Sequence, residues 1–224
     1  SVAEVVSDVL RFVVQMIPMC LLALVVFLIV RPARLRRLKT RGLVSGTLRE
    51  ITLCLFLLFC AGLAALTLFP ANIWSYVISF GQGWYDGASF FSFYPTWEQT
   101  MSSLAYLSNM LTPFQEIRRA LDHMSYWGLF MLLGNIIMFM PIGFFPALLW
   151  RRWRWWKSLL AGFCSSFTIE FIQFFIGRST DIDDVILNTA GALAGFWVFW
   201  LLRAVFPNFV EKFQCTPRGG YYCG

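Results

Sequence analysis

The feature that most constrains this chain is a series of long apolar runs without a charged residue. Examples are Met19–Val30, Ile51–Phe69 and Leu129–Trp150. A helix rises about 1.5 Å per residue, so roughly 20 apolar residues cross a ~30 Å hydrocarbon core. Hydrophobic residues make up 58% of the chain and charged residues 13%, against about half and about a quarter in soluble domains. Because charges are too few to cover a soluble surface, the sequence predicts a polytopic membrane protein.

Five apolar segments are long enough to span a bilayer. We expect spans over about Val9–Val30, Leu48–Phe69, Tyr126–Trp150, Ser158–Ile176 and Val185–Val205. Pro18 is expected to kink the first, and Pro141-Ile142-Gly143 to break the third. The predicted fold is an all-α membrane helix bundle of about five transmembrane helices, with an external amphipathic helix at the membrane interface.

Lys and Arg cluster in two short segments beside these spans. Residues 31–42 hold six basic residues and no acid, and residues 151–157 are basic and aromatic. Loops of this kind face the cytoplasm, which predicts the N-terminus outside and the C-terminal tail inside. The same placement accounts for the net charge of +6 without a nucleic-acid partner. Residues 31–42 could also touch anionic lipid headgroups, although topology alone explains them.

The segment from Ala71 to about Ser125 is rich in aromatic residues and poor in charges. Because Trp and Tyr favour the bilayer interface, we expect an external segment that lies in the headgroup layer or dips back into the membrane. Within it, Thr112 as N-cap and Pro113 at the first helical position predict an amphipathic helix near residues 113–123. His123, the only histidine, is expected to be a surface or packing residue.

A polar hairpin, residues 166–191, joins the last two predicted spans. Each span carries a stripe of small and polar residues at helical spacing. On the fourth these are Gly162, Ser166, Glu170, Gln173 and Gly177, and on the fifth Asp184, Asn188, Gly191 and Gly195. Small residues let membrane helices approach closely, and polar residues bond across the contact. We therefore expect the two stripes to face each other or a common cavity.

Glu170 lies about 10 Å from Gly177 along its helix, near the middle of the bilayer. A charged carboxylate at a helix centre costs roughly 2.5–3.5 kcal/mol on insertion scales. One interpretation is a neutral acid that is hydrogen-bonded to Asn188 or Asn135. The other is a ligand-binding or proton-handling group reached from outside, which the charged residues after it favour.

The connection between the fourth and fifth predicted spans is acidic and holds Asp181, Asp183 and Asp184. Oxygen-rich clusters suit Mg²⁺ or Ca²⁺, but the run DIDD lacks the full EF-hand spacing, so the cofactor is left open, with a divalent cation such as Mg²⁺ as one candidate. The aspartates could equally cap the fifth span, where carboxylates favour the helix dipole. We predict one externally open cavity with Glu170, Asp183, Asp184 and Arg178 as catalytic residues and Asn135, Gln173, Asp181 and Asn188 as substrate-binding residues.

Three blocks of the chain together resemble a known family. The blocks are Asn135 with Phe139–Phe144, then Ser166–Gln173, then Arg178–Gly191. In their order and spacing they resemble the VanZ family, named after a protein associated with resistance to the glycopeptide antibiotic teicoplanin. The resemblance covers about residues 105–203 and implies a bacterial cytoplasmic-membrane protein that acts at the cell envelope, with a role in glycopeptide or lipoglycopeptide susceptibility. It implies no settled reaction. The expected organisation is a two-helix membrane region with an external aromatic loop (1–104), a VanZ-like domain (105–206) and a cytoplasmic tail (207–224).

The sequence is compatible with two functions, of which one is enzymatic and the other is not. One is a membrane enzyme that acts on an amphiphilic or lipid-linked envelope substrate, with Glu170 as general acid or base and Arg178 holding an anionic group. The other is a non-catalytic protein that binds membrane lipid or antibiotic and alters surface access. A proton-coupled transporter is a third choice, because five spans without a detectable repeat fit the usual two-fold designs poorly.

Overall fold

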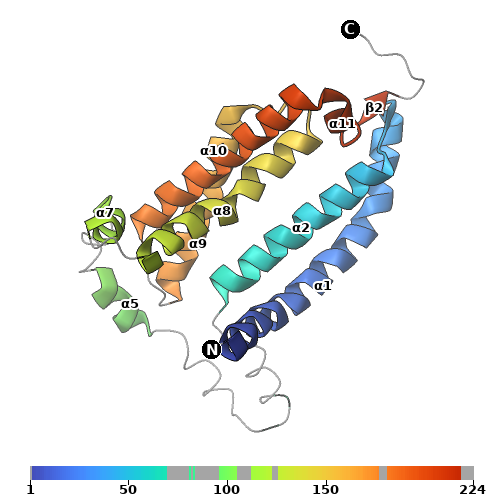
Figure 1. Cartoon of the computed structure of the whole chain (residues 1–224). Coiled ribbons are helices and arrows are strands. Elements are labelled where there is room, and N and C mark those ends of the chain that lie inside the picture. The colour runs from blue at the N-terminus through green and yellow to red at the C-terminus, as the bar shows by residue number, and fades with distance from the viewer. Residues whose placement is uncertain are drawn as a thin grey trace.

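The computed structural model describes residues 2–69, 81, 83, 96–104, 112–122, 126–176 and 181–217. The described helices are α1 (Val2–Thr40), α2 (Thr47–Leu68), α5 (Trp97–Leu104), α7 (Gln115–Asp122), α8 (Tyr126–Leu149), α9 (Trp155–Phe175), α10 (Ile182–Val205) and α11 (Pro207–Glu211). Two short strands, β1 (Leu43–Val44) and β2 (Thr216–Pro217), accompany them (Figure 1). Five of these helices are long and apolar enough to cross a membrane, which confirms the predicted all-α bundle.

The predicted spans match α2, α8, α9 and α10 to within a few residues. The first helix is longer, because α1 continues through Pro32 to Thr40 and carries most of the first basic segment as helix. The predicted break in the third span is wrong: α8 runs unbroken through Pro141 and Pro146. A proline removes one backbone hydrogen bond, but membrane helices tolerate that loss where neighbouring helices pack closely.

The closest helix contact lies between α8 and α10. A Cβ atom added at Gly191 would lie 2.2 Å from the carbonyl oxygen of Ile136, and one at Gly195 would lie 1.9 Å from that of Met140. From α8, a Cβ at Gly143 would lie 1.7 Å from a backbone oxygen of α10. Only glycine fits at these positions. The small residues of the fifth span therefore face α8, while polar residues of the same helix reach both α8 and α9.

The C-terminal tail returns to the connection between α1 and α2. Leu43 pairs with Pro217 and Val44 with Thr216 in an antiparallel arrangement. In α11, Val210 is buried in a cluster with Ala147, Leu148, Phe196 and Phe199 of α8 and α10. The tail and the α1–α2 connection thus lie at the same end of the bundle (Figure 1), as the predicted topology requires. Which side of the membrane this end faces stays a prediction.

Two short helices lie at the opposite end of α8 and α10 (Figure 1). The short helix predicted near residues 113–123 is confirmed as α7, although it begins at Gln115 and not at Pro113. Its place at the membrane interface stays a prediction. Helix α5 begins with a reciprocal cap, because Thr96 N donates to the Gln99 side chain at 2.9 Å and Gln99 N donates to the Thr96 side chain at 3.3 Å. Most of the aromatic segment, together with His123, lies outside the described residues.

Candidate functional site

The buried carboxylate of Glu170 ties the end of α9 to the start of α10. Its side chain is 6% exposed, and its Oε2 accepts a hydrogen bond from the backbone N–H of Asp181 at 3.1 Å. The expected amide partners are engaged elsewhere: Asn188 donates to Ser166, and Asn135 donates to Asp184. Glu170 therefore serves as an acceptor for the connection between the two spans and not as a partner of either asparagine.

The start of α10 is capped by Asp181. Its Oδ1 accepts a hydrogen bond from the backbone N–H of Asp183 at 2.9 Å. A carboxylate here satisfies one of the N–H groups that lack a partner within the helix, and it favours the helix dipole. The alternative in which the aspartates cap the fifth span is thus correct for Asp181. Asp183 and Asp184 lie in the first turn of the same helix but point to other partners.

Asp183 caps a different helix. Its side chain, 1% exposed, accepts hydrogen bonds from the backbone N–H of Phe114 and, at 3.2 Å, from that of Ile117. Phe114 has a φ of 67°, a left-handed conformation that α-helical residues do not adopt. The prediction of Pro113 as the first helical residue is wrong for this reason. A carboxylate on α10 instead supplies acceptors for the first N–H groups of α7.

Two further hydrogen bonds join α10 to its neighbouring spans α8 and α9. Asn135 Nδ2 on α8 donates to Asp184 Oδ1 at 2.6 Å. Asn188 Nδ2 on α10 donates to Ser166 Oγ on α9 at 2.9 Å, and both residues are buried. The Oδ1 atom of Asn188 is buried and has no hydrogen-bond partner among the described residues. A ligand that donates a hydrogen bond would satisfy this acceptor.

The predicted site residues divide into two groups. Glu170, Asp181, Asp183, Asp184 and Asn135 come together where α7, α8, α9 and α10 meet, and Asn188 lies about one turn deeper along α10. Gln173 points away from them, because its Nε2 donates to the carbonyl oxygen of Thr67 on α2 at 2.9 Å. Arg178 lies outside the described residues. Within the described ranges, no group of three or more His, Cys, Asp or Glu residues is placed to hold a metal ion.

The partners that sequence reasoning missed are mostly backbone groups. The N–H groups of Phe114 and Ile117 and the carbonyl of Thr67 carry no side-chain signature. Ser166 is different, because it lies on the same predicted stripe as Glu170, four residues before it. From its place on that stripe, the hydrogen bond of Ser166 with Asn188 could have been predicted.

The VanZ/LLP1 family model matches residues 56–203, a range that contains every predicted site residue. No curated protein matches the chain, and no solved structure does. Because the match covers more than half of the 224 residues, this protein belongs to the VanZ/LLP1 family.

Proposed function

We propose that this protein acts at the bacterial cell envelope, in the cytoplasmic membrane, where the polar end of α8, α9 and α10 handles an amphiphilic or lipid-linked substrate. A lipid-linked cell-wall precursor or a lipoglycopeptide such as teicoplanin has the required chemistry. The observation that carries the proposal is a continuous hydrogen-bonded path. It runs from buried Glu170 through Asp181 and Asp183 to the first turn of α7.

Burial of these carboxylates within a membrane bundle supports a functional role. Glu170 and Asp183 are 6% and 1% exposed, and ionisable groups at such positions are expensive and usually mark a functional site. Backbone N–H groups offset part of that cost, because each carboxylate accepts at least one of them. The path would connect substrate binding at the membrane surface, where α7 is expected to lie, with the carboxylate of Glu170 inside the bundle.

Helix α7 provides a suitable surface for an amphiphilic substrate. It presents exposed Arg118, Arg119 and Leu121, and exposed Phe114 lies directly before its first residue. Guanidinium groups bind phosphate and carboxylate well, and an amphipathic helix at the interface meets both the polar headgroup and the apolar chain of a lipid. Because Asp183 holds the first turn of α7, it would fix this surface relative to the bundle and act as a positioning residue.

In the catalytic form of the proposal, Glu170 gives one proton to the substrate or takes one from it. This is the usual contribution of a buried carboxyl group to acid–base catalysis. Asp184 and Asn135 would hold α8 against α10, and Arg178 would bind an anionic group. The Oδ1 atom of Asn188, which has no partner among the described residues, would accept a hydrogen bond from a donor on the substrate.

The second candidate is a non-catalytic protein that binds lipid or antibiotic and alters access to the cell surface. The bonds from Asp181 and Asp183 to backbone N–H groups favour it. Bonds of this kind hold α7 and α10 in place and require no proton transfer. Both candidates use the same end of the bundle and differ in whether the bound molecule is changed.

The deciding experiment incubates purified protein with a labelled lipid-linked cell-wall precursor, with and without Mg²⁺. The enzyme predicts a covalently changed product that accumulates with time. The binding protein predicts saturable retention of unchanged precursor. If the precursor is neither changed nor retained, and expression leaves teicoplanin susceptibility of cells unaltered, the proposal fails in both forms.

A further inference from the structure

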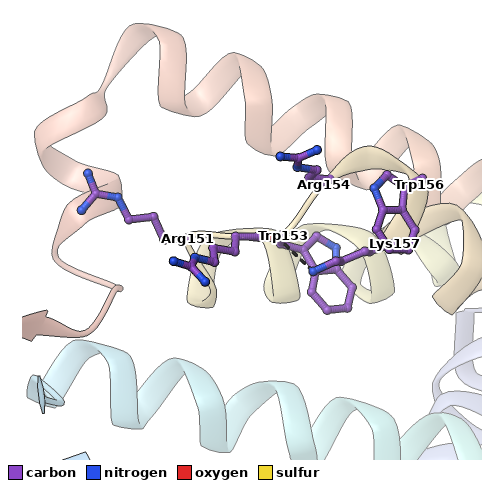
Figure 2. Close-up of a pocket in the computed structure, with 6 residues that line it drawn as sticks. Arg151, Trp153, Arg154, Trp156 and Lys157 are labelled. Carbon is purple, nitrogen blue, oxygen red and sulfur yellow. Dashed lines mark hydrogen bonds between the residues drawn. The ribbon is translucent and has the colours of Figure 1, made fainter. Parts of the chain in front are cut away.

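The loop between α8 and α9 forms a basic pocket at the end of the bundle remote from the polar site. The pocket has a volume of about 450 Å³ and is lined by Arg151, Arg152, Trp153, Arg154, Trp156 and Lys157 (Figure 2). Two tryptophan rings and four cationic side chains therefore share one short segment of chain. Trp and basic residues together are typical of the membrane–water interface.

None of these four cations forms an ion pair with a carboxylate in the described part of the chain. Lys157 donates to the backbone oxygen of Arg152 at 3.2 Å and lies over the rings of Trp153 and Trp156. The other basic segment differs, because its Arg31 and Arg34 both pair with buried Glu50. Glu50 thus offsets one positive charge of that segment, whereas no carboxylate in the described part of the chain pairs with the cations of the pocket.

The backbone adds to this positive potential. Helix α9 begins at Trp155, and its N-cap Arg154 makes no side-chain cap hydrogen bond, because a guanidinium group has no acceptor. The start of a helix carries partial positive charge and unsatisfied N–H groups, which suit a phosphate. An anion in the pocket would provide the acceptor that Arg154 cannot.

A second pocket adjoins the first. Its volume is also about 450 Å³, and it shares Arg152, Trp153 and Lys157 with the basic pocket. The rest of its lining is apolar and comes from α2, α8, α9 and the residue after α8, namely Phe56, Ile142, Pro146, Trp150 and Ala161. Trp153 is held in place between the two, because its Nε1 donates to Ser158 Oγ at 2.8 Å. Ser158 is fully buried and donates in turn to the backbone oxygen of Gly143 at 3.3 Å.

We propose that these two pockets together bind one anionic phospholipid. The phosphate of its headgroup lies among Arg151, Arg152 and Arg154, and one acyl chain lies against Phe56, Ile142 and Ala161. A basic pocket between membrane helices is a recognised setting for anionic headgroups. A shared wall of Arg152, Trp153 and Lys157 gives the geometry that a molecule with a charged head and an apolar tail requires. This site lies at the start of α9, whereas the polar site of the proposed function lies at its end.

The test measures lipid retention on delipidated full-length protein in detergent, with long-chain phosphatidylglycerol as the anionic probe and phosphatidylcholine as the neutral one. The proposal predicts saturable binding of phosphatidylglycerol, at least about tenfold tighter than phosphatidylcholine. The double variant Arg152→Gln/Arg154→Gln should weaken phosphatidylglycerol binding by about tenfold or more. Equal binding of the two lipids would overturn the proposal.

A matched control separates a defined site from general attraction to positive charge. Arg36→Gln/Arg37→Gln removes the same charge from exposed positions outside the pocket, so phosphatidylglycerol affinity should change by less than about twofold. An equal loss in both double variants would show non-specific attraction and contradict the site.

The acyl-chain half of the site has its own test. Ala161→Phe should fill the apolar pocket and weaken phosphatidylglycerol binding, while inorganic phosphate at the same concentration should not displace the lipid. Unchanged lipid affinity in Ala161→Phe, or displacement by inorganic phosphate alone, would show that the headgroup accounts for the binding and would refute a phospholipid site. Because the readout is lipid binding, these outcomes do not depend on the activity proposed for the polar end.

Discussion

Asp183 Oδ2 accepts a hydrogen bond from the backbone N–H of Ile117 at 3.2 Å, across 66 positions of sequence. The carboxylate belongs to a membrane-spanning helix, and the N–H belongs to the first turn of the short helix α7. A helix of eight residues is marginal by itself in water. This side chain from α10 therefore helps to hold α7 in place, together with the packing of α7 against α8.

The first prediction concerns this cap. Asp183→Ala should leave the N–H groups of Phe114 and Ile117 without their acceptor and destabilise the protein by about 1–3 kcal/mol, with faster hydrogen exchange in residues 115–122. Asp183→Asn keeps one acceptor oxygen and should have a smaller effect. Asp122→Asn, at the exposed far end of α7, is the control and should leave exchange unchanged. Normal protection of α7 in Asp183→Ala would show that the cap is dispensable.

Glu170 gives the second prediction. In Glu170→Gln an oxygen remains to accept the Asp181 N–H, so the protein should fold with a normal monodisperse yield in detergent but lose its activity on lipid-linked precursor. Glu170→Leu removes the acceptor from a buried N–H and should cost about 1–3 kcal/mol, which lowers that yield. A Glu170→Gln protein that folds and works like the parent would defeat the proton-handling role and leave the binding protein as the better candidate.

The third prediction concerns the contact between α8 and α10. Gly195→Ala would place a Cβ 1.9 Å from a backbone oxygen of α8, and relief of such overlap typically costs about 1–3 kcal/mol. Gly134→Ala is the matched control, because it lies in α8 with no atom within 4 Å of the added Cβ. It should be neutral or stabilise by up to about 1 kcal/mol. Thermal inactivation in detergent compares the two, and equal behaviour would refute the close contact.

The fourth prediction concerns the hydrogen bond between Asn188 and Ser166. A double-mutant cycle with Ser166→Ala and Asn188→Ala should give a coupling free energy of about 0.6 kcal/mol, a typical value for polar contacts between membrane helices. The measurement is the free energy of unfolding of the four proteins in detergent. Additive effects of the two changes would mean that the bond contributes no coupling.

Membrane orientation is the fifth prediction. In a cysteine-free background, an impermeant maleimide applied to intact cells should label Asp122→Cys, and it should label Thr40→Cys only after permeabilisation. Both positions are exposed in the structure, so access depends on the side of the membrane and not on burial. Labelling of Thr40→Cys in intact cells would reverse the topology.

Span positions could be predicted from the sequence because they depend on length and local composition. The boundaries of α2, α8, α9 and α10 follow from runs of apolar residues between basic or polar ends. The N-cap role of Asp181 is also local, since its partner is two residues away. The start of α5 could have been predicted from Thr96 and Gln99, which have the spacing of a reciprocal cap.

The features that could not be predicted depend on contacts distant in sequence. Nothing near Phe114 specifies a left-handed backbone or an acceptor on α10, so a local reading placed the helix start two residues too early. Gln173 shares a stripe with Glu170 but is drawn to the carbonyl of Thr67, 106 residues away. From local sequence alone, Pro141 predicts a break in the helix. Only packing against α10 explains why α8 continues through it.

The pairing of β1 with β2 has a mechanical consequence for the bundle. Leu43 and Val44 connect α1 to α2, whereas Thr216 and Pro217 follow the last span by way of α11. The connection that follows the first span and the tail that follows the last span are thus fastened together at one end of the bundle. Any hinge-like separation of the α1–α2 pair from α8 and α10 at this end must first break the strand pair. Opening should therefore begin at the other end, where the polar site lies.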